Sequence, residues 1–148
     1  MIIGIYKTIV SLILWPIWFV YLVIILPVFL IYIAFVNRRY YHYFLRPMSY
    51  FFCLFGGQLV KLNGKPPDPN SGPYLYVMNH VSLFDHFVIG IYIKHYVAAI
   101  AKFEQFKYPL WGAVAKYYGI VPINRSNIKK AMDSLKIVEE LIANNRIS

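Results

Sequence analysis

The sequence predicts an α/β domain with a mainly parallel sheet, preceded by a helical segment that anchors the chain in a membrane. Three observations predict it: a long uncharged apolar run at residues 8–36, a turn-rich segment at residues 61–73, and alternating strand and helix patterns after that segment. Of the 148 residues, 59% are hydrophobic and only 14% are charged, which is unusual for a soluble domain. We therefore divide the chain into an anchor with an interfacial helix, residues 1–55, and an α/β domain, residues 56–148.

The apolar run exceeds the roughly 20 residues that a membrane-spanning helix requires. Pro16 and Pro27 interrupt it, and each removes a backbone donor, so both a kinked helix and two shorter helices fit the sequence. Whether the segment crosses the membrane or dips into one leaflet is left open by the sequence. A cleaved signal peptide is the competing interpretation, but the run is too long and no small-residue cleavage site follows it.

Positive charge is in excess and unevenly placed. The chain has fifteen lysines and arginines against six acidic residues, a net charge of +9, which predicts attraction to anionic lipid head groups, phosphorylated substrates or nucleic acid. The apolar composition favours the first two, so we expect membrane phospholipids and no nucleic acid as partners. Only Lys7 precedes the apolar run, and three arginines follow it: Arg38, Arg39 and Arg46. This asymmetry places the domain on the cytoplasmic side if the run crosses the membrane.

Residues 37–55 mix arginine and histidine with many aromatic residues. This composition fits a helix at the level of the lipid head groups, or a helix that packs on the domain. The single cysteine, Cys53, lies in this aromatic stretch and is expected to be a small buried hydrophobic residue without a catalytic role. A loop is predicted at residues 61–73, where glycine, proline, asparagine and aspartate are dense.

After the loop, short apolar runs alternate with amphipathic segments. The predicted elements are a buried strand at 74–78, a helix at 83–93, strands at 97–101 and 119–123, and a helix that begins after Ser126 as its N-cap and runs to 145. Strands that alternate with helices in this order are typical of an α/β sandwich.

The polar residues that directly follow the first predicted strand suggest chemistry. An imidazole at His80, with the carboxylate of Asp85 five residues later, has the makings of a general base whose orientation a carboxylate fixes. Residues five apart do not share a face of a regular helix, so His80 must lie in the turn before the helix. Ser82 is then expected near the N-cap and Asp85 in the first turn, from which its side chain reaches back. The free amides of the helix N-terminus would face the same site, where they would steady an anion.

Two alternatives use the same residues. The stretch from Ser82 to Asp85 matches a capping box, in which Asp85 simply accepts a bond from a backbone amide and His80 is a polar loop residue. A metal site made by His80, Asp85 and His86 is the other alternative. No further cluster supports it, because His95 stands alone and the remaining histidine lies beside the anchor, so we predict no metal.

Three blocks in order give the sequence a family resemblance. The first is Asn79-His80 to Asp85, an N-H-x4-D motif after a buried strand; the second is Ala101-Lys102, followed by a proline-containing segment; the third is Gly119-Ile120-Val121-Pro122-Ile123-Asn124-Arg125. From about residue 60 to its end the chain resembles the lysophosphatidic acid acyltransferases (1-acylglycerol-3-phosphate O-acyltransferases). The family's third block reads G-x-x-F-I-D/N-R, so Val121-Pro122 is a departure in its middle.

The resemblance implies a function and roles for single residues. His80 would take the proton from a glycerol hydroxyl that attacks an acyl thioester, and Asp85 would hold the imidazole. Arg125 would bind the phosphate of the lysophospholipid acceptor with Lys102 adding positive charge, although Arg125 is equally typical of a solvated residue between a strand and a helix. The matched blocks add two further candidate substrate-binding residues, Asn124 and Ser82. The donor, acyl-CoA or acyl carrier protein thioester, would be a co-substrate, and no resident cofactor is expected.

Members of this family continue, after a helix like that at 126–145, into a strand with an E-G-T-R block that helps to hold the phosphate. The sequence ends at Ser148 without this block, so we expect a C-terminally truncated acyltransferase domain. A non-catalytic, membrane-anchored fragment that binds lipid is the alternative. A membrane hydrolase that uses His80 and Asp85 with water is a third hypothesis.

Overall fold

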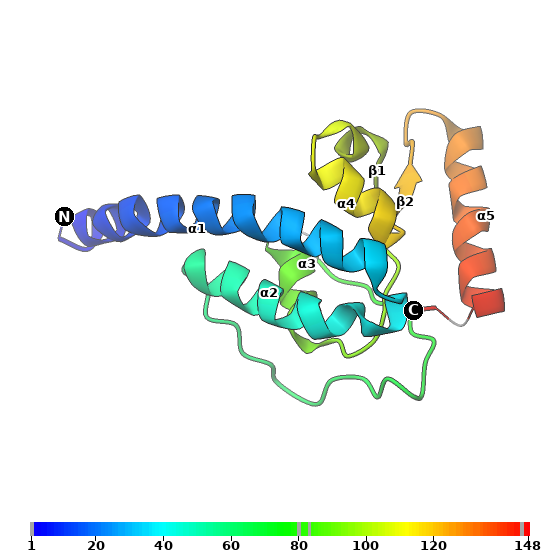
Figure 1. Cartoon of the computed structure of the whole chain (residues 1–148), viewed down its shortest axis with the longest axis horizontal. Coiled ribbons are helices and arrows are strands. Elements are labelled where there is room, and N and C mark those ends of the chain that lie inside the picture. The colour runs from blue at the N-terminus through cyan, green and yellow to red at the C-terminus, as the bar shows by residue number, and fades with distance from the viewer. Residues whose placement is uncertain (1, 80, 83, 146) are drawn as a thin grey trace.

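The computed structural model describes residues 2–79, 81–82, 84–145 and 147–148, with the side chains of residues 2–7 and 145 left out. Five helices and two strands make up the described part of the chain (Figure 1). They are α1 (Ile2–Phe35), α2 (Tyr41–Phe55), α3 (Asp85–Tyr92), β1 (Ile100–Lys102), α4 (Trp111–Tyr118), β2 (Val121–Ile123) and α5 (Ile128–Asn145). Short 3₁₀ turns, Arg38–Tyr40 and Phe103–Lys107, precede α2 and α4. The predicted fold class is confirmed as a partial α/β domain behind an apolar helix.

The N-terminal apolar segment forms one helix, α1, which continues through Pro16 and Pro27. Its stretch Thr8–Phe35 has a mean hydropathy of 2.7 and is long and apolar enough to cross a membrane. One side of α1 packs against α2 and α4, and only 22% of its most apolar part is buried. The remaining face is covered with exposed large apolar side chains, so α1 differs from the buried core helix of a soluble protein.

Helix α2 packs on the domain, which is the second of the two possibilities that its sequence allowed. Phe52 is its centre: the ring stacks on Phe87 of α3 with ring centroids 3.6 Å apart and meets Trp18 of α1 at 4.9 Å. Cys53 is buried beside it, as expected for a small hydrophobic residue, and burial raises the pKa of its thiol. A thiol with a raised pKa is a poor nucleophile, which agrees with a packing role.

The buried strand predicted at residues 74–78 is wrong. This segment pairs with no strand in the described structure, and the side chains of Leu75 and Val77 are 83% and 85% exposed. Ser148 explains the difference, because its hydroxyl accepts a bond from the Tyr74 amide (3.1 Å) and its backbone oxygen accepts one from the Ala98 amide (2.8 Å). The chain around Ser148 thus lies between the segments at 74–78 and 97–101, both of which were predicted to be strands. An apolar run becomes a strand only where a partner pairs with it.

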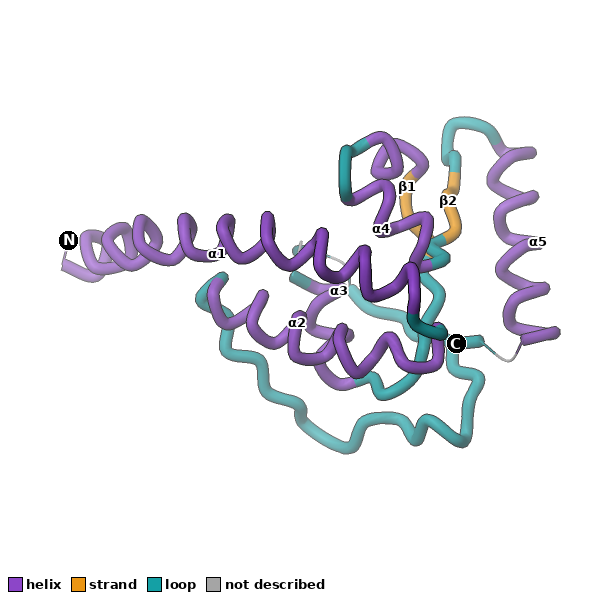
Figure 2. The backbone as a smooth tube through the Cα atoms, in the orientation of Figure 1, coloured by secondary structure: helices purple, strands orange, loops and turns teal. Residues whose placement is uncertain are grey.

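The two strands that form are parallel and short. Ile100 pairs with Val121 and Lys102 with Ile123, so both strands end at the same edge. They are joined by the crossover through α4, and α5 packs against β2 (Figure 2). The N-cap expected at Ser126 is wrong by one residue, because Asn127 accepts the bond from the Lys130 amide (3.0 Å).

Candidate functional site

The turn before α3 is built around the Asp85 carboxylate. Asp85 is the first residue of α3, and its Oδ2 accepts hydrogen bonds from the backbone amides of Val81 and Ser82, both at 2.8 Å. The Ser82 hydroxyl oxygen in turn accepts a bond from the Phe84 amide at 3.2 Å. Asp85 therefore stands in the first turn and reaches back toward the preceding loop, as the five-residue spacing predicts. The same bonds are those of a cap, so the observed geometry agrees with both interpretations.

His80, the candidate base, lies outside the described residues. The described structure places the Asp85 carboxylate against the amide of Val81, the residue that follows His80. A carboxylate in that place is held by two backbone donors and keeps a fixed orientation. The catalytic roles of His80 and Asp85 remain predictions.

The backbone amides of the loop before α3, and that of Asp85 itself, are bonded within the turn, whereas the expectation of free amides in the rest of the first helical turn stays a prediction. The amides of Val81 and Ser82 are bound to Asp85, that of Phe84 to the Ser82 hydroxyl, and that of Asp85 to the Ser82 carbonyl oxygen at 3.3 Å. Because the carboxylate and the hydroxyl use these donors, the turn does not present them to a developing oxyanion. The capping-box alternative predicted that Asp85 would accept a bond from a backbone amide, and the structure shows two such bonds.

Helix α3 is held firmly below this turn. Gly90 approaches α2 so closely that a Cβ there would lie 2.5 Å from the Ser49 hydroxyl oxygen. At the end of α3, the Arg46 guanidinium donates to the Ile91 carbonyl oxygen (3.0 Å), and the Tyr92 hydroxyl donates to the Val60 carbonyl oxygen (3.0 Å). The turn is therefore presented from a rigid support, as a catalytic group requires.

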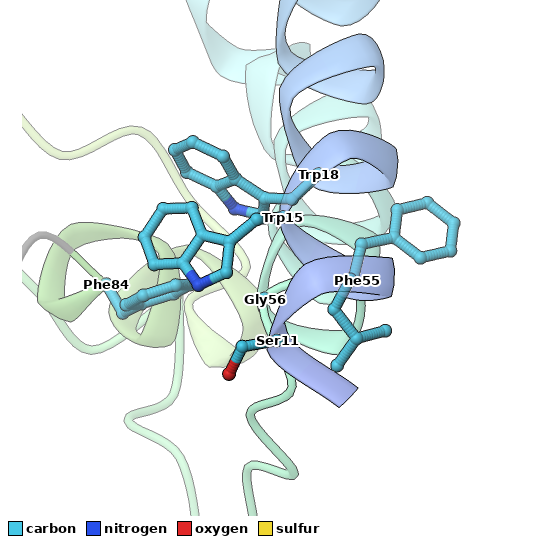
Figure 3. A pocket seen from close by; sticks show the side chains of 7 residues that line it. Ser11, Trp15, Trp18, Phe55, Gly56 and Phe84 are labelled. Atoms are coloured by element: carbon cyan, nitrogen blue, oxygen red, sulfur yellow. The ribbon is translucent and has the colours of Figure 1, made fainter. Parts of the chain in front are cut away.

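An apolar hollow adjoins the turn. Phe84, the residue before Asp85, lines a small cavity of about 50 Å³ together with Trp15, Trp18 and Phe55. Figure 3 shows the Trp15, Trp18 and Phe84 rings gathered around one space, with α1 supplying the two tryptophans. From the sequence, Trp15 and Trp18 suit an aromatic belt at the membrane interface, and no cavity was predicted there. The hollow connects the candidate site to the apolar helix.

The remaining candidates gather at the carboxyl edge of the small sheet. Lys102 ends β1 beside Ile123, and Arg125 follows β2 by two residues; both basic side chains are exposed. Asn124 has its side-chain oxygen engaged by the amide (3.0 Å) and hydroxyl (2.6 Å) of Ser126, so it shapes the turn. The parallel register thus brings Lys102 close to the Arg125 loop, as the order of the strands predicts.

These two groups belong to different packing units. The turn at Asp85 rests on α3, which packs against α2, whereas the edge at Arg125 belongs to β2, which is covered by α5. The structure therefore places Ser82 beside Asp85, and Lys102 near the loop of Arg125. Among the described elements, the main packing contacts do not join these two pairs. Over the ranges that the structure describes, no three histidine, cysteine or acidic side chains form a group suited to a metal ion.

Comparison with known proteins shows which family this chain is similar to. A family model described as Acyltransferase matches residues 59–147. A 1-acyl-sn-glycerol-3-phosphate acyltransferase of Helicobacter pylori is 32% identical over 101 residues, which cover 68% of this chain and 41% of that protein. One of Cocos nucifera is 35% identical over 74 residues, 50% of this chain and 24% of that protein. The chain thus spans less than half the length of these curated relatives. No solved structure matches it significantly.

Proposed function

Because the chain belongs to the acyltransferase family, we propose that it carries the His80 and Asp85 site of a membrane-associated enzyme that acylates lysophosphatidic acid to phosphatidic acid. Both relatives reported above are named for acyl transfer to 1-acyl-sn-glycerol-3-phosphate. The observation that carries the proposal is the position of the Asp85 carboxylate, which is turned back onto the loop that directly follows His80.

The proposed reaction needs one base and no acyl-enzyme. His80 removes the proton from the free glycerol hydroxyl as that oxygen bonds to the carbonyl carbon of an acyl thioester. The tetrahedral intermediate collapses, the carbon–sulfur bond breaks, and the proton passes from His80 to the leaving thiolate. Asp85 holds the imidazole and stabilises its charged form. The donor is a thioester on coenzyme A or acyl carrier protein, used as a co-substrate, and the reaction as proposed requires no resident cofactor.

Arg125 is proposed to bind the acceptor phosphate. A guanidinium bonds bidentately to phosphate oxygens, and the exposed side chain of Arg125 has room to do so. Lys102 ends the neighbouring strand and adds a second positive charge at this edge. For Arg125 to serve the same acceptor as His80, the sheet edge and the turn before α3 must both reach one bound lipid.

The membrane location follows from α1. Its exposed face carries apolar side chains along most of its length, and such a surface is stable only against lipid or another apolar partner. Acceptor and product are both lipids, so an enzyme held at the bilayer meets them where they reside. The arginines after α1, set against the single Lys7 before it, favour a catalytic part on the cytoplasmic side.

Replacing His80 tests the proposal most directly. In the intact protein, His80→Ala is expected to abolish acyl transfer from acyl-CoA to lysophosphatidic acid and to leave the protein in the membrane fraction. His86→Ala is the matched control, because His86 is an exposed histidine of α3 with no role in the proposed reaction. Unchanged turnover in His80→Ala would remove the base assignment. Equal loss in both variants would favour the metal alternative, and loss of thioester without lysophospholipid would favour a hydrolase.

A further inference from the structure

A basic cavity lies apart from the turn that carries Asp85. It has a volume of about 400 Å³ and is lined by residues from four parts of the chain: Arg39, Pro69, Asn70, Gly72, Lys94, His95, Tyr96, Ile147 and Ser148. This volume lies within the range of roughly 300–1,000 Å³ that is usual for small-ligand sites. Asp85 stands at the start of α3, whereas the cavity residues Lys94 to Tyr96 follow its end. The helix between them has eight residues and is about 12 Å long.

The charge of the cavity selects the ligand. Two of its lining side chains, Arg39 and Lys94, are cations, and no lining side chain is acidic. Ser148, the last residue of the sequence, adds one carboxylate, which accepts a bond from the Ala98 amide, so the lining keeps a net positive charge. Arg39 contacts the Tyr40 ring at 5.5 Å, and within the described part of the chain neither cation is taken up by a salt bridge. Asp68 precedes the lining residue Pro69 but does not itself line the cavity, and its carboxylate accepts bonds from the Asn70 amide and the Ser71 hydroxyl within its own turn. The cavity is therefore suited to an anion.

The walls of the cavity are fixed by hydrogen bonds. The His95 ring shares a bond of 3.1 Å with the Tyr76 hydroxyl, and the Tyr96 hydroxyl donates to the Tyr118 carbonyl oxygen at 2.8 Å. His95 keeps its other ring nitrogen, Nδ1, buried and without a partner among the residues described. That nitrogen is closed off from solvent, so it belongs to the fixed wall of the cavity and not to the surface that a ligand would meet.

The position of the cavity selects the source of the anion. Arg39 follows Phe35, the last residue of α1, by four positions, and Phe35 is 87% exposed. The cavity therefore opens where the apolar surface of α1 ends, which is the depth of the lipid head groups if α1 lies in the bilayer. We propose that this cavity binds the phosphate of an anionic phospholipid whose acyl chains lie along α1, as a site separate from the reacting lipids. The proposal rests on the membrane location proposed above and not on the acyl-transfer reaction.

Lipid retention in native mass spectrometry tests the site. The intact protein is transferred from detergent micelles that hold equal amounts of phosphatidylglycerol and phosphatidylcholine with identical chains. The wild type is expected to retain phosphatidylglycerol preferentially. In the double variant Arg39→Gln, Lys94→Gln, the ratio of retained phosphatidylglycerol to retained phosphatidylcholine is expected to fall roughly 25-fold. Each basic residue near a lipid surface contributes about a factor of five to that ratio.

Two further variants make the result specific. The control Lys129→Gln, Lys130→Gln removes the same charge from the exposed first turn of α5. That turn lies at the far end of an 18-residue helix from the cavity, so this variant is expected to retain the lipid. Arg39→Lys, Lys94→Arg keeps the charge and is expected to bind normally. Equal loss in both glutamine pairs would show general charge attraction and overturn the proposal, as would equal retention of both lipids by the wild type.

A third arm separates lipid from free anion. Millimolar inorganic phosphate is expected to leave the retained phosphatidylglycerol in place. Displacement of the lipid by phosphate would show a site for free anions and contradict the commitment to a lipid. The assay contains no thioester, so a protein that retains phosphatidylglycerol but fails to transfer acyl groups would refute the proposed reaction alone.

Discussion

Replacing Asp85 by asparagine separates the two roles that its carboxylate can have in the turn before α3. As a cap, the side chain needs an oxygen that accepts from the amides of Val81 and Ser82, and an asparagine oxygen still supplies one. As the partner of a catalytic imidazole it needs the negative charge, which asparagine lacks. Asp85→Asn should therefore fold and fail to react, whereas Asp85→Ala should lose both functions.

The expected magnitudes follow from the two bonds of 2.8 Å. A bond to a charged group contributes about 1.5–3 kcal/mol, but Val81 is exposed and Asp85 half-buried, so water competes and the lower end applies. We expect Asp85→Ala to reduce the free energy of unfolding by about 2–3 kcal/mol and Asp85→Asn by about 1 kcal/mol. For transfer, losing the carboxylate beside a catalytic histidine predicts a fall in kcat of roughly 10³- to 10⁴-fold in both variants.

Urea unfolding in detergent measures the first quantity, and initial rates of lysophosphatidic acid acylation measure the second. Asp68→Asn is the matched control, because Asp68 also accepts a backbone amide bond, from Asn70 at 2.9 Å, but lies in the loop before residue 74. It should leave kcat unchanged. An Asp85→Asn enzyme with wild-type kcat would refute the catalytic role and leave the cap as the whole explanation.

Three further perturbations follow from the structure. Gly90→Ala should lower the free energy of unfolding by about 1–3 kcal/mol, because the new Cβ would lie 2.5 Å from the Ser49 hydroxyl oxygen. Urea unfolding measures this change. An unchanged free energy of unfolding would show that α2 and α3 separate easily. Arg125→Ala should raise the KM for lysophosphatidic acid and leave kcat nearly unchanged; steady-state kinetics measure this, and an unaltered KM would count against the phosphate contact. Burial, and next the charge of His42, lower the pKa of His95 from its ordinary 6.5. As the pH falls, His95 is therefore protonated in the unfolded chain before it is protonated in the folded one. The free energy of unfolding should be highest above pH 6.5 and should decrease below it. Unfolding curves between pH 7.5 and 5 should show a smaller decline in His95→Gln; an identical decline would exclude His95 as its source.

The sequence predicted local features well wherever neighbouring residues decide them. The continuous apolar stretch is a helix, the segment at 61–73 is a loop, and Asp85 stands in the first turn of its helix. The helix follows from an unbroken apolar run, the loop from its turn residues, and the place of Asp85 from its spacing to its neighbours in the sequence. The amide bonds of Asp85 were predicted for the same reason, since Ser82 and Asp85 are close in the sequence.

Contacts between distant residues decided the rest. The apolar residues at 74–78 have the composition of a strand, yet they pair with no strand in the described structure, Tyr74 bonds to Ser148 instead, and Leu75 and Val77 remain exposed. The packing of α2 on Phe87 of α3, and the basic cavity shared by Arg39 and Lys94, likewise join segments far apart in the chain. Sequence alone determined the apolar helix, the loop at 61–73 and the place of Asp85 at the start of its helix, because these depend on local composition and spacing. Only the tertiary structure decided which segments pair and which charges meet, because both depend on how distant parts of the chain come together.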